Sequence, residues 1–302
     1  MTETPMPRPV RSMLFVPADS EKKIAKSQSV GADAIILDLE DSVSPARKDT
    51  ARAMAAEVLR DARGGGGAAV WVRINPFDSE HALADLAAVV RGGPAGIMLP
   101  KAAGPDDLVR LSHCLDVLEL RDSLAPGSIR TLPVATETAG AALRLPLYAE
   151  RAVPRLFGLT WGAEDLSADL GAAGNRGDDG RLALTYRTVR AMMLLAAKAA
   201  GVAAIDAIWP DFRDLEGLRA DSLSSRREGF AGRMAIHPAQ VEPINEAYSP
   251  SADEISHAEA VVAAFDAEPD AGVVALDGKM LDMPHLKQAR HIIAMRDAFG
   301  PR

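Results

Sequence analysis

The sequence predicts a (β/α)8 barrel, the TIM-barrel fold, followed by a C-terminal helical extension. Eight short apolar segments recur along the chain, and longer segments with helical spacing of apolar residues lie between them. This alternation is typical of a parallel sheet, and eight repeats favour a closed barrel over an open sheet. The chain has 302 residues, of which 48% are hydrophobic and 25% are charged. Two domains would also fit this length, but α/β barrels of about 250 residues commonly form one unit.

The predicted strands are the apolar segments themselves, in chain order residues 12–16, 34–39, 70–74, 96–99, 131–136, 156–161, 203–208 and 232–236. The predicted helices between them are the segments rich in helix formers, at residues 20–30, 48–62, 79–90, 105–116, 139–149 and 182–200. Four consecutive glycines, residues 64–67, are expected to form a flexible connection from a helix to the third strand. Four residues are too few for a linker between domains.

We assign residues 1–240 to the barrel and residues 241–302 to the extension. The extension has helical patterns near residues 252–265 and 286–299, which flank residues 272–284. A barrel does not need this segment. It therefore either caps the barrel or packs on a neighbouring subunit, and the second arrangement is common in homo-oligomers.

Charge and composition exclude several classes of protein. The 34 Lys and Arg residues against 42 Asp and Glu residues give a formal net charge of −8, which disfavours binding to nucleic acid. No stretch of about eighteen apolar residues predicts a membrane span, and residues 1–11 lack the apolar run of a signal peptide. The single Cys114 cannot form an internal disulfide. We therefore expect a cytoplasmic protein.

Active sites of (β/α)8 barrels lie at the carboxyl ends of the strands, so the polar residues that follow each apolar segment are the candidates. The polar residues that follow strands two to six and strand eight are Asp38, Glu40, Asp41, Arg73, Lys101, Glu137, Asp165 and His237. Glu137 and Asp165 follow adjacent strands and have no His or Cys beside them in the sequence. Carboxylates on separate strands suit a hard divalent ion that keeps water and substrate as ligands, which favours Mg²⁺ over Zn²⁺.

Cations are also expected at this mouth of the barrel. The guanidinium groups of Arg11 and Arg73 suit bidentate binding of a carboxylate or of an enolate-like oxygen. The alternative for each arginine is a structural ion pair with Asp38, Glu40 or Asp41. Lys101 could form a Schiff base, but its many acidic neighbours favour a salt bridge.

Nine motifs resemble the citrate lyase β-subunit-like family of the HpcH/HpaI aldolase superfamily, which includes citramalyl-CoA and malyl-CoA lyases. They are RSMLFVP (11–17), LDLEDSV (37–43) followed by ARK (46–48), VRIN (72–75), LPK (99–101), ETAG (137–140), GAEDL (162–166), DFRD (211–214), AIHPAQV (235–241) and LDMP (281–284). Because they cover residues 11 to about 288 in the order of the family, chance does not explain them.

The resemblance implies a (β/α)8 barrel that assembles into a homotrimer or hexamer and binds Mg²⁺ through Glu137 and Asp165. It also implies a CoA thioester as substrate, cleaved to acetyl-CoA and a 2-oxo acid, with Arg11, Arg73 and Glu137 in contact with the substrate. Arg73 would stabilise the enolate oxygen. Asp282 would enter the active site of a neighbouring subunit and handle the proton at the acetyl carbon. From the residues alone, Asp282 is instead an N-cap of the helix that starts near Pro284.

Other residues have expected supporting roles, either at the mouth or on the CoA side: Asp38, Glu40, Asp41, Arg47, Lys101, Arg233 and His237. Arg233 replaces a lysine found in many family members, which leaves its contact with a CoA phosphate open. His237 is assigned to structure on the CoA side. Residues 171–181 form a loop that differs among relatives and is a candidate for substrate selection.

Three alternative functions remain at this point. The chain could be the β subunit of a citrate lyase complex that acts on an acyl-carrier thioester. The same site could also serve a malyl-CoA thioesterase or a condensing synthase. A barrel without activity could serve as a binding scaffold, but packing gives no reason to keep Arg73, Glu137 and Asp165 together.

Overall fold

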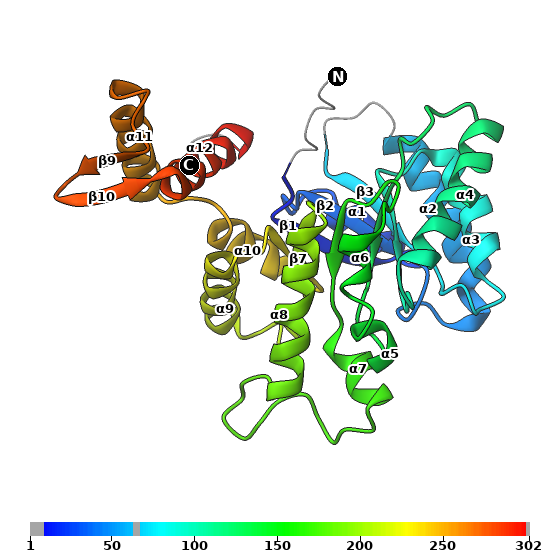
Figure 1. Cartoon of the computed structure of the whole chain (residues 1–302). Helices are drawn as coiled ribbons and strands as arrows, with labels where there is room; N and C mark the ends of the chain where they lie inside the picture. The colour runs from blue at the N-terminus through cyan, green and yellow to red at the C-terminus, as the bar shows by residue number, and fades with distance from the viewer. Residues whose placement is uncertain (1–8, 63–66, 300–302) are drawn as a thin grey trace. The chain divides into compact units, whose positions relative to one another are not determined.

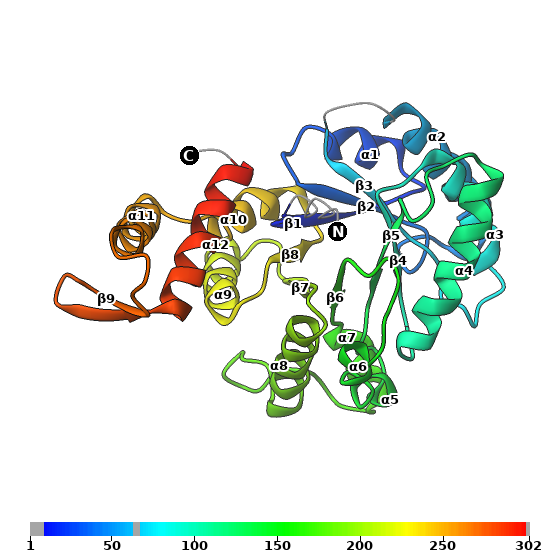
Figure 2. The same cartoon turned by 45° about the horizontal axis from the view of Figure 1, so that its top comes forward.

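The computed structural model describes residues 9–62 and 67–299, which form two compact units (Figures 1 and 2). The first unit is Val10–Ile244, and the second contains the described residues from Asn245 onward together with Pro9. Residues 1–8 and three of the four consecutive glycines lie outside the described residues, so the expectations for these segments are not addressed by the structure. No described helix has both the length and the apolar character needed to cross a membrane.

The first unit contains the predicted eight-stranded parallel barrel. The strands are β1 (Ser12–Pro17), β2 (Ala34–Asp38), β3 (Ala69–Arg73), β4 (Gly96–Leu99), β5 (Arg130–Pro133), β6 (Gly158–Thr160), β7 (Ala203–Asp206) and β8 (Gly232–Ala235). Their order in the sheet is β5-β4-β3-β2-β1-β8-β7-β6, and two isolated parallel bridges, Thr131 to Leu156 and Val134 to Thr160, connect the two edges. The predicted (β/α)8 barrel is therefore confirmed.

The barrel is a packed core, as close-packed side chains from neighbouring strands require. Met13, Ile36, Trp71, Met98 and Leu132 belong to one buried cluster drawn from successive strands. The Trp71 ring leaves no room for a side chain on the neighbouring strand, since a Cβ on Gly96 would lie 2.2 Å from it. The close approach of β3 and β4 therefore depends on Gly96.

Helices cover the outside of the strands; α2, α3 and α4 lie next to one another in Figures 1 and 2. The helices of this unit are α1 (Glu21–Ser27), α2 (Lys48–Ala62), α3 (Ala82–Val89), α4 (Pro105–Arg121), α5 (Ala139–Ala142), α6 (Leu147–Glu150), α7 (Ala163–Asp169), α8 (Leu184–Ala199), α9 (Leu215–Glu228) and α10 (Val241–Ala247), the last of which crosses the boundary between the units. The helix predicted over residues 139–149 is two short helices, because Pro146 cannot continue a helical hydrogen-bond ladder.

The second unit has its own small core. Helices α11 (Ala252–Ala267) and α12 (Met283–Phe299) flank an antiparallel hairpin of β9 (Val273–Leu276) and β10 (Lys279–Asp282). Val261, Phe265, Val274, Leu281 and Leu286 are buried together in this core. The sequence predicts the two helices but not the hairpin, which turns at Asp277 and Gly278 with positive φ values of 49° and 75°.

Candidate active site

A cavity of about 860 Å³ opens at the carboxyl ends of the barrel strands. Arg73, Glu137, Asp165, Trp161 and Trp209 are among the residues that line it. These side chains come from four different βα units, so the fold brings to one place residues that are far apart in the chain. A concave site with a few convergent charged groups is the usual form of a small-molecule site.

Arg73 and Asp38 form a bidentate ion pair at the edge of this cavity. The register of β2 and β3 places Asp38 directly opposite Arg73. Arg73 Nε and Nη2 donate to the two oxygens of Asp38 at 2.7 Å each, and the guanidinium lies 4.8 Å from the Phe15 ring centroid. Burial opposes ionisation of Asp38, but the hydrogen bonds and charge of Arg73 hold its pKa below the usual value. The structural ion pair left open by the sequence is therefore present.

The third nitrogen of the Arg73 guanidinium faces the carboxylate of Glu40. Arg73 Nη1 lies 3.0 Å from Glu40 Oε2 and 3.9 Å from Asp41 Oδ2. Glu40 is buried, which raises its pKa against the opposing charge of Arg73, whereas the Asp41 side chain is 60% exposed. Asp38 and Glu40 therefore hold the planar guanidinium from two sides, and this fixes its orientation.

Lys101, which follows β4, joins acidic groups that follow β2 and β6, and this agrees with the salt bridge favoured by the sequence. Its Nζ lies 2.5 Å from Glu40 Oε1, 3.5 Å from Asp165 Oδ1 and 3.9 Å from Asp41 Oδ2. Its backbone has a positive φ of 51°, an uncommon conformation for a residue with a side chain, and its N–H donates to Glu137. Burial opposes the ammonium charge, but the contact with Glu40 raises the pKa of Lys101, so the amine is a poor nucleophile.

Glu137 and Asp165 are the two carboxylates predicted to bind a cation, and both line the cavity. Glu137 is only 4% exposed, whereas the Asp165 side chain is 39% exposed and reaches the open part of the cavity. Burial raises the pKa of Glu137 to about 8, the N–H of Lys101 opposes this, and the charges of Asp165 and Glu40 add to it. A bound cation beside this carboxyl would lower its pKa and favour the ionised form.

The donor set fits Mg²⁺, which binds few carboxylates and keeps several waters. Among residues 9–62 and 67–299, no group of three or more His, Cys, Asp or Glu side chains is placed to hold a metal ion. Glu137 and Asp165 would therefore supply two ligands, and water or substrate would supply the rest. The absence of sulfur and imidazole donors beside them is unfavourable for Zn²⁺.

In the metal-free protein, we expect the free energy of unfolding to fall as the pH rises from about 5 to 8. The folded chain holds a proton on Glu137 up to about pH 8, whereas an unfolded carboxyl releases it near pH 4.3. Because the folded state binds more protons in this window, raising the pH favours unfolding. Denaturant titrations in EDTA at several pH values measure the slope, and Glu137→Gln should reduce it.

The matched control is Glu164→Gln, which neutralises the exposed carboxylate that accepts a hydrogen bond from Asn175. This variant should retain the slope of the unmodified protein. An identical slope in Glu137→Gln and in the unmodified protein would show that Glu137 titrates normally.

The expectation that Arg11 lies beside the mouth and binds substrate is wrong. Arg11 precedes β1 and forms a bidentate ion pair with Asp33, which precedes β2; Nε and Nη2 lie 2.8 Å from the two carboxylate oxygens. Both residues lie at the amino ends of parallel strands, the opposite end of the barrel from Glu137. An ion pair was the alternative for Arg11, although with a different partner.

Arg233 is held in a buried network of hydrogen bonds. Its guanidinium donates to Asp206 and Ser222 at 2.9 and 3.0 Å and also contacts Asp221. Asp206 is fully buried and accepts hydrogen bonds from Arg190 and from the indole of Trp161, at 2.8 and 2.7 Å. Arg233 is also among the residues that line the cavity, and its contact with a CoA phosphate stays a prediction.

The remaining candidates, Arg47, His237 and Asp282, are not among the residues that line the cavity. Arg47 is exposed and pairs with Asp19 at 2.7 Å. His237 Nδ1 accepts a hydrogen bond from the N–H of Ala239, and its ring stacks on Phe212, as expected for a structural histidine at a strand end. Asp282 directly precedes α12, and its Oδ1 lies 2.5 Å from His285 Nδ1. Asp282 therefore occupies the position expected of an N-cap, but its side chain contacts the His285 ring.

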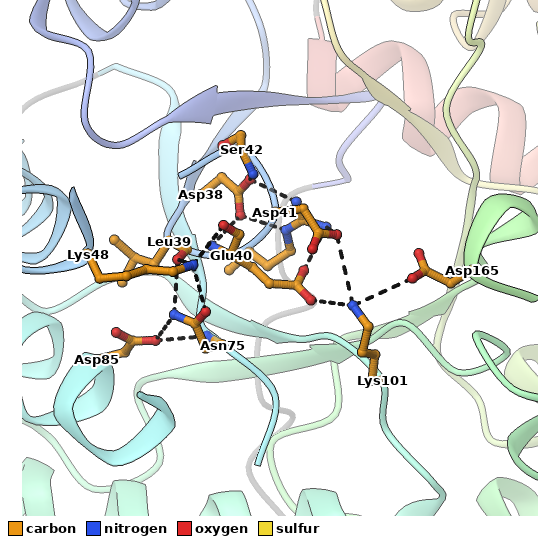
Figure 3. A network of polar contacts seen from close by, with 11 residues as sticks. Asp38, Leu39, Glu40, Asp41, Ser42, Lys48, Asn75, Asp85, Lys101 and Asp165 are labelled. Carbon is orange, nitrogen blue, oxygen red and sulfur yellow. Dashed lines mark hydrogen bonds and ion pairs between the residues drawn. The ribbon is translucent and has the colours of Figure 1, made fainter. Parts of the chain in front are cut away.

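A second polar network was not predicted, and it lies behind residues 39–42, which follow β2 and are called the β2 loop below (Figure 3). It contains Lys48, Asn75 and Asp85, all of which are buried. Asp85 lies on the inner face of α3 with Ala82, Leu86 and Val89, where the helical pattern calls for an apolar residue. This charged residue on an apolar helix face is the signal from which the network could have been predicted.

A model of one protein family, described as HpcH/HpaI aldolase/citrate lyase, matches residues 11–238. The chain is 36% identical to a (3S)-malyl-CoA thioesterase of Cereibacter sphaeroides, over 97% of this chain and 96% of the relative. It is 34% identical to the citrate lyase subunit beta of Escherichia coli, over 97% and 95% of the two chains. It is also 34% identical to the mitochondrial citramalyl-CoA lyase of Rattus norvegicus, over 95% and 86%.

The fold is similar to that of the solved CitE protein of Mycobacterium tuberculosis in complex with magnesium, acetoacetate and coenzyme A. The TM-score is 0.76 at 34% sequence identity, over 96% of this chain and 98% of the other. Similarity at this level extends over the barrel and the C-terminal unit, which matches the extent of the motifs in the sequence.

Proposed function

Because the chain belongs to the HpcH/HpaI aldolase/citrate lyase family, we propose that it is a Mg²⁺-dependent carbon–carbon lyase acting on a 3-hydroxyacyl thioester. Citramalyl-CoA or malyl-CoA is the substrate type, and acetyl-CoA and a 2-oxo acid are the products. The observation that carries this proposal is the convergence of Arg73, Glu137 and Asp165 on one cavity. Relatives with lyase names and a related structure that contains magnesium and coenzyme A support it.

Glu137 and Asp165 would hold the metal ion. When bound, Mg²⁺ polarises substrate oxygens and makes a coordinated hydroxyl more acidic. The buried carboxyl of Glu137 suits this role, because its pKa is raised and a neighbouring cation would favour its ionised form. The backbone N–H of Lys101 fixes one of its oxygens, which leaves the carboxylate oriented toward the cavity that it lines.

Arg73 would stabilise the charge that develops during cleavage. A base takes the proton of the substrate hydroxyl, and the hydroxyl carbon becomes the carbonyl carbon of the 2-oxo acid as its bond to the adjacent CH₂ breaks. The electron pair of that bond stays with the acetyl fragment, whose thioester oxygen becomes an enolate oxygen. A cation held rigidly beside that oxygen lowers the barrier, because no reorganisation is needed during the reaction. Asp38, Glu40 and the Phe15 ring supply this rigidity.

The enolate carbon must then receive a proton to become acetyl-CoA, and we assign this proton transfer to Asp282. It would act in the cavity of a neighbouring subunit of a homotrimer or hexamer. The contact with His285 keeps the Asp282 carboxylate at the start of α12, with its side chain 52% exposed and thus available to a partner. We place this enzyme in the cytoplasm, since its one cysteine, Cys114, suits a reducing compartment.

Mixed oligomers test the shared site. Asp282→Ala and Glu137→Gln proteins should each be nearly inactive alone, yet regain part of the activity after mixing and subunit exchange. Some composite sites then contain an intact cavity and an intact Asp282, whereas sites with both changes stay inactive. Steady-state assays before and after mixing measure the recovery.

Exchange itself must be demonstrated by native mass spectrometry of differently tagged chains. The control is a mixture of Asp282→Ala with unmodified protein, whose activity should follow the same mixing statistics. Demonstrated exchange without regained activity would mean that Asp282 does not serve a neighbouring site.

The proposed reaction is tested with purified protein, Mg²⁺ and a panel of malyl-, citramalyl- and citryl-thioesters, each on CoA and on an acyl carrier. Mass spectrometry of the products distinguishes the candidates. A 2-oxo acid with acetyl-CoA supports the lyase, whereas cleavage only on the acyl carrier indicates a citrate lyase β subunit. No cleavage of any thioester, with the metal supplied, would reject the proposal.

A second candidate is a malyl-CoA thioesterase, which the similarity to the (3S)-malyl-CoA thioesterase of Cereibacter sphaeroides favours. Water then attacks the thioester carbon, and the products are free CoA and the intact 3-hydroxy acid. Incubation of acetyl-CoA with a 2-oxo acid tests the reverse, condensing direction of the same site. With malyl-CoA as the substrate, formation of malate and CoA without glyoxylate would assign the thioesterase activity.

A further inference from the structure

Lys48 is a buried ammonium group directly behind the acidic β2 loop (Figure 3). Its Nζ donates to the backbone carbonyls of Leu39 and Glu40, at 2.6 and 2.8 Å, and to Asn75 Oδ1 at 2.8 Å. These three acceptors use all three hydrogens of the ammonium group. Lys48 also begins α2, and a cation is unfavourable at the N-terminus of a helix. Stabilisation of the helix therefore does not explain this lysine.

The two carbonyls that accept from Lys48 are those of Leu39 and of Glu40 itself, so Lys48 contacts the backbone that positions the Glu40 side chain. On the opposite side of the loop, the N–H groups of Glu40 and Ser42 donate to the Asp38 carboxylate, at 3.0 and 3.1 Å. The Leu39–Glu40 peptide is therefore fixed at both its carbonyl and its N–H. With the backbone fixed in this way, the Glu40 side chain reaches Lys101 and Arg73.

Asn75 accepts a hydrogen bond from Lys48, and Asp85 in turn fixes Asn75. Asn75 Nδ2 donates to the Leu39 carbonyl at 2.9 Å and to Asp85 at 2.6 Å, and the backbone N–H of Asn75 donates to Asp85 at 2.8 Å. Asp85 is fully buried and also accepts from Arg52 Nε at 2.7 Å. Because Lys48, Asn75 and Asp85 are buried and hydrogen-bonded to one another or to the Leu39 carbonyl, few other arrangements are open to them, and the network can transmit its rigidity to the loop.

We propose that Lys48 is a positioning residue of the active site, which holds the Leu39–Glu40 backbone so that Glu40 fixes Arg73 and Lys101 for the reaction. It touches neither the cavity nor the substrate, and it acts through the loop. Its effect on rate rests on the proposed function, but its effect on the position of Glu40 does not. Burial lowers the pKa of Lys48, because desolvation disfavours the charged ammonium group. Packing of α2 alone would not require a charged group at this buried position.

Lys48→Met keeps much of the side-chain volume and removes all three donors. We expect kcat to fall about 100-fold with KM nearly unchanged, because small displacements of a catalytic group have effects of this size and act mainly in the transition state. Propylammonium ions should restore part of the activity of Lys48→Ala, which leaves space for them. Propanol of the same size should not, because it has no positive charge.

The matched control is Arg155→Met, which removes another buried cation that donates to a backbone carbonyl, that of Ile129, and to Glu119. Arg155 precedes β6 and lies at the amino ends of the strands, so this variant should lose stability but keep kcat. If kcat falls equally in Lys48→Met and Arg155→Met, Lys48 has only a structural role. The same conclusion holds if propanol rescues Lys48→Ala as strongly as propylammonium does.

A crystal structure of Lys48→Met tests the proposal without any substrate. We expect the Leu39–Glu40 peptide to rotate and the Glu40 carboxylate to leave Lys101; an unchanged Glu40 would overturn the proposal even if no thioester is cleaved. If Lys48→Met does not fold, Asn75→Ala takes its place, since it removes one of the two hydrogen bonds to the Leu39 carbonyl and one acceptor of Lys48. It should shift Glu40 in the same direction, and an unchanged Glu40 there would count equally against the proposal.

Discussion

Glu137→Gln is expected to abolish metal-dependent thioester cleavage, with a loss of at least ~10³-fold in kcat, because metal ions contribute several kcal/mol to such reactions. The amide has the shape of the carboxyl group and still accepts the hydrogen bond from Lys101, but it supplies no charge for the cation. Asp165→Asn should have the same effect on activity. Steady-state kinetics with a Mg²⁺ titration, and calorimetry of Mg²⁺ binding, measure the two losses separately.

The fold should survive both changes, because residues beyond the strand ends contribute little to the barrel core. Thermal unfolding in EDTA therefore serves as the stability control. Asp106→Asn is the matched conservative variant: this exposed carboxylate pairs with Arg151 on the outside of the barrel, and its loss should leave activity unchanged. Undiminished activity in either Glu137→Gln or Asp165→Asn would reject the metal assignment of that residue.

Arg73→Lys is expected to lower kcat by ~10²-fold or more, as removal of an oxyanion donor does. Lysine keeps the positive charge but loses the planar fork that meets both oxygens of Asp38 and, at the same time, Glu40. A single ammonium group cannot make all three contacts, so the cation is no longer fixed beside the enolate oxygen. Parallel falls in kcat and kcat/KM would locate the interaction in the transition state.

A rise in KM alone, with kcat intact, would instead make Arg73 a uniform binding contact. The matched control is Arg110→Lys, because Arg110 also lies over an aromatic ring, at 4.5 Å from the Phe77 centroid, but outside the large cavity. This variant should retain kcat. Loss of activity in both variants would point to a general effect of removing guanidinium groups.

The fold and the location of the site could be predicted because both follow from local patterns. Apolar segments of strand length alternating with helical segments identify a βα barrel, and the chemistry of barrels occurs at one end of the strands. Arg73, Lys101, Glu137 and Asp165 were found in this way, since each closes or directly follows an apolar segment. Arg11 was misplaced because it opens its strand, and the residue that opens a parallel strand lies at the opposite end of the barrel.

The partners of these residues could not be predicted, because pairing depends on register and on packing between segments far apart in the chain. The pairing of Asp38 with Arg73 requires the register of β2 against β3, and that of Arg11 with Asp33 requires the contact of β1 with β2. The split of the helix could have been predicted from the sequence, because Pro146 lies within the predicted segment and interrupts a helix. The β9–β10 hairpin was harder to predict, because its strands are only four residues long and only one residue in each is buried.

The sequence by itself determined the strand and helix order, the (β/α)8 class and the ionisable residues at the carboxyl ends of the strands, since periodicity and chain order are properties of the chain alone. Only the tertiary structure decided which charges meet and which are buried. The raised pKa of Glu137 and the three acceptors of Lys48 arise from desolvation and from contacts across β2, β3 and β4. Such effects fall off within a few ångströms, so they depend on positions in space and not on spacing along the chain.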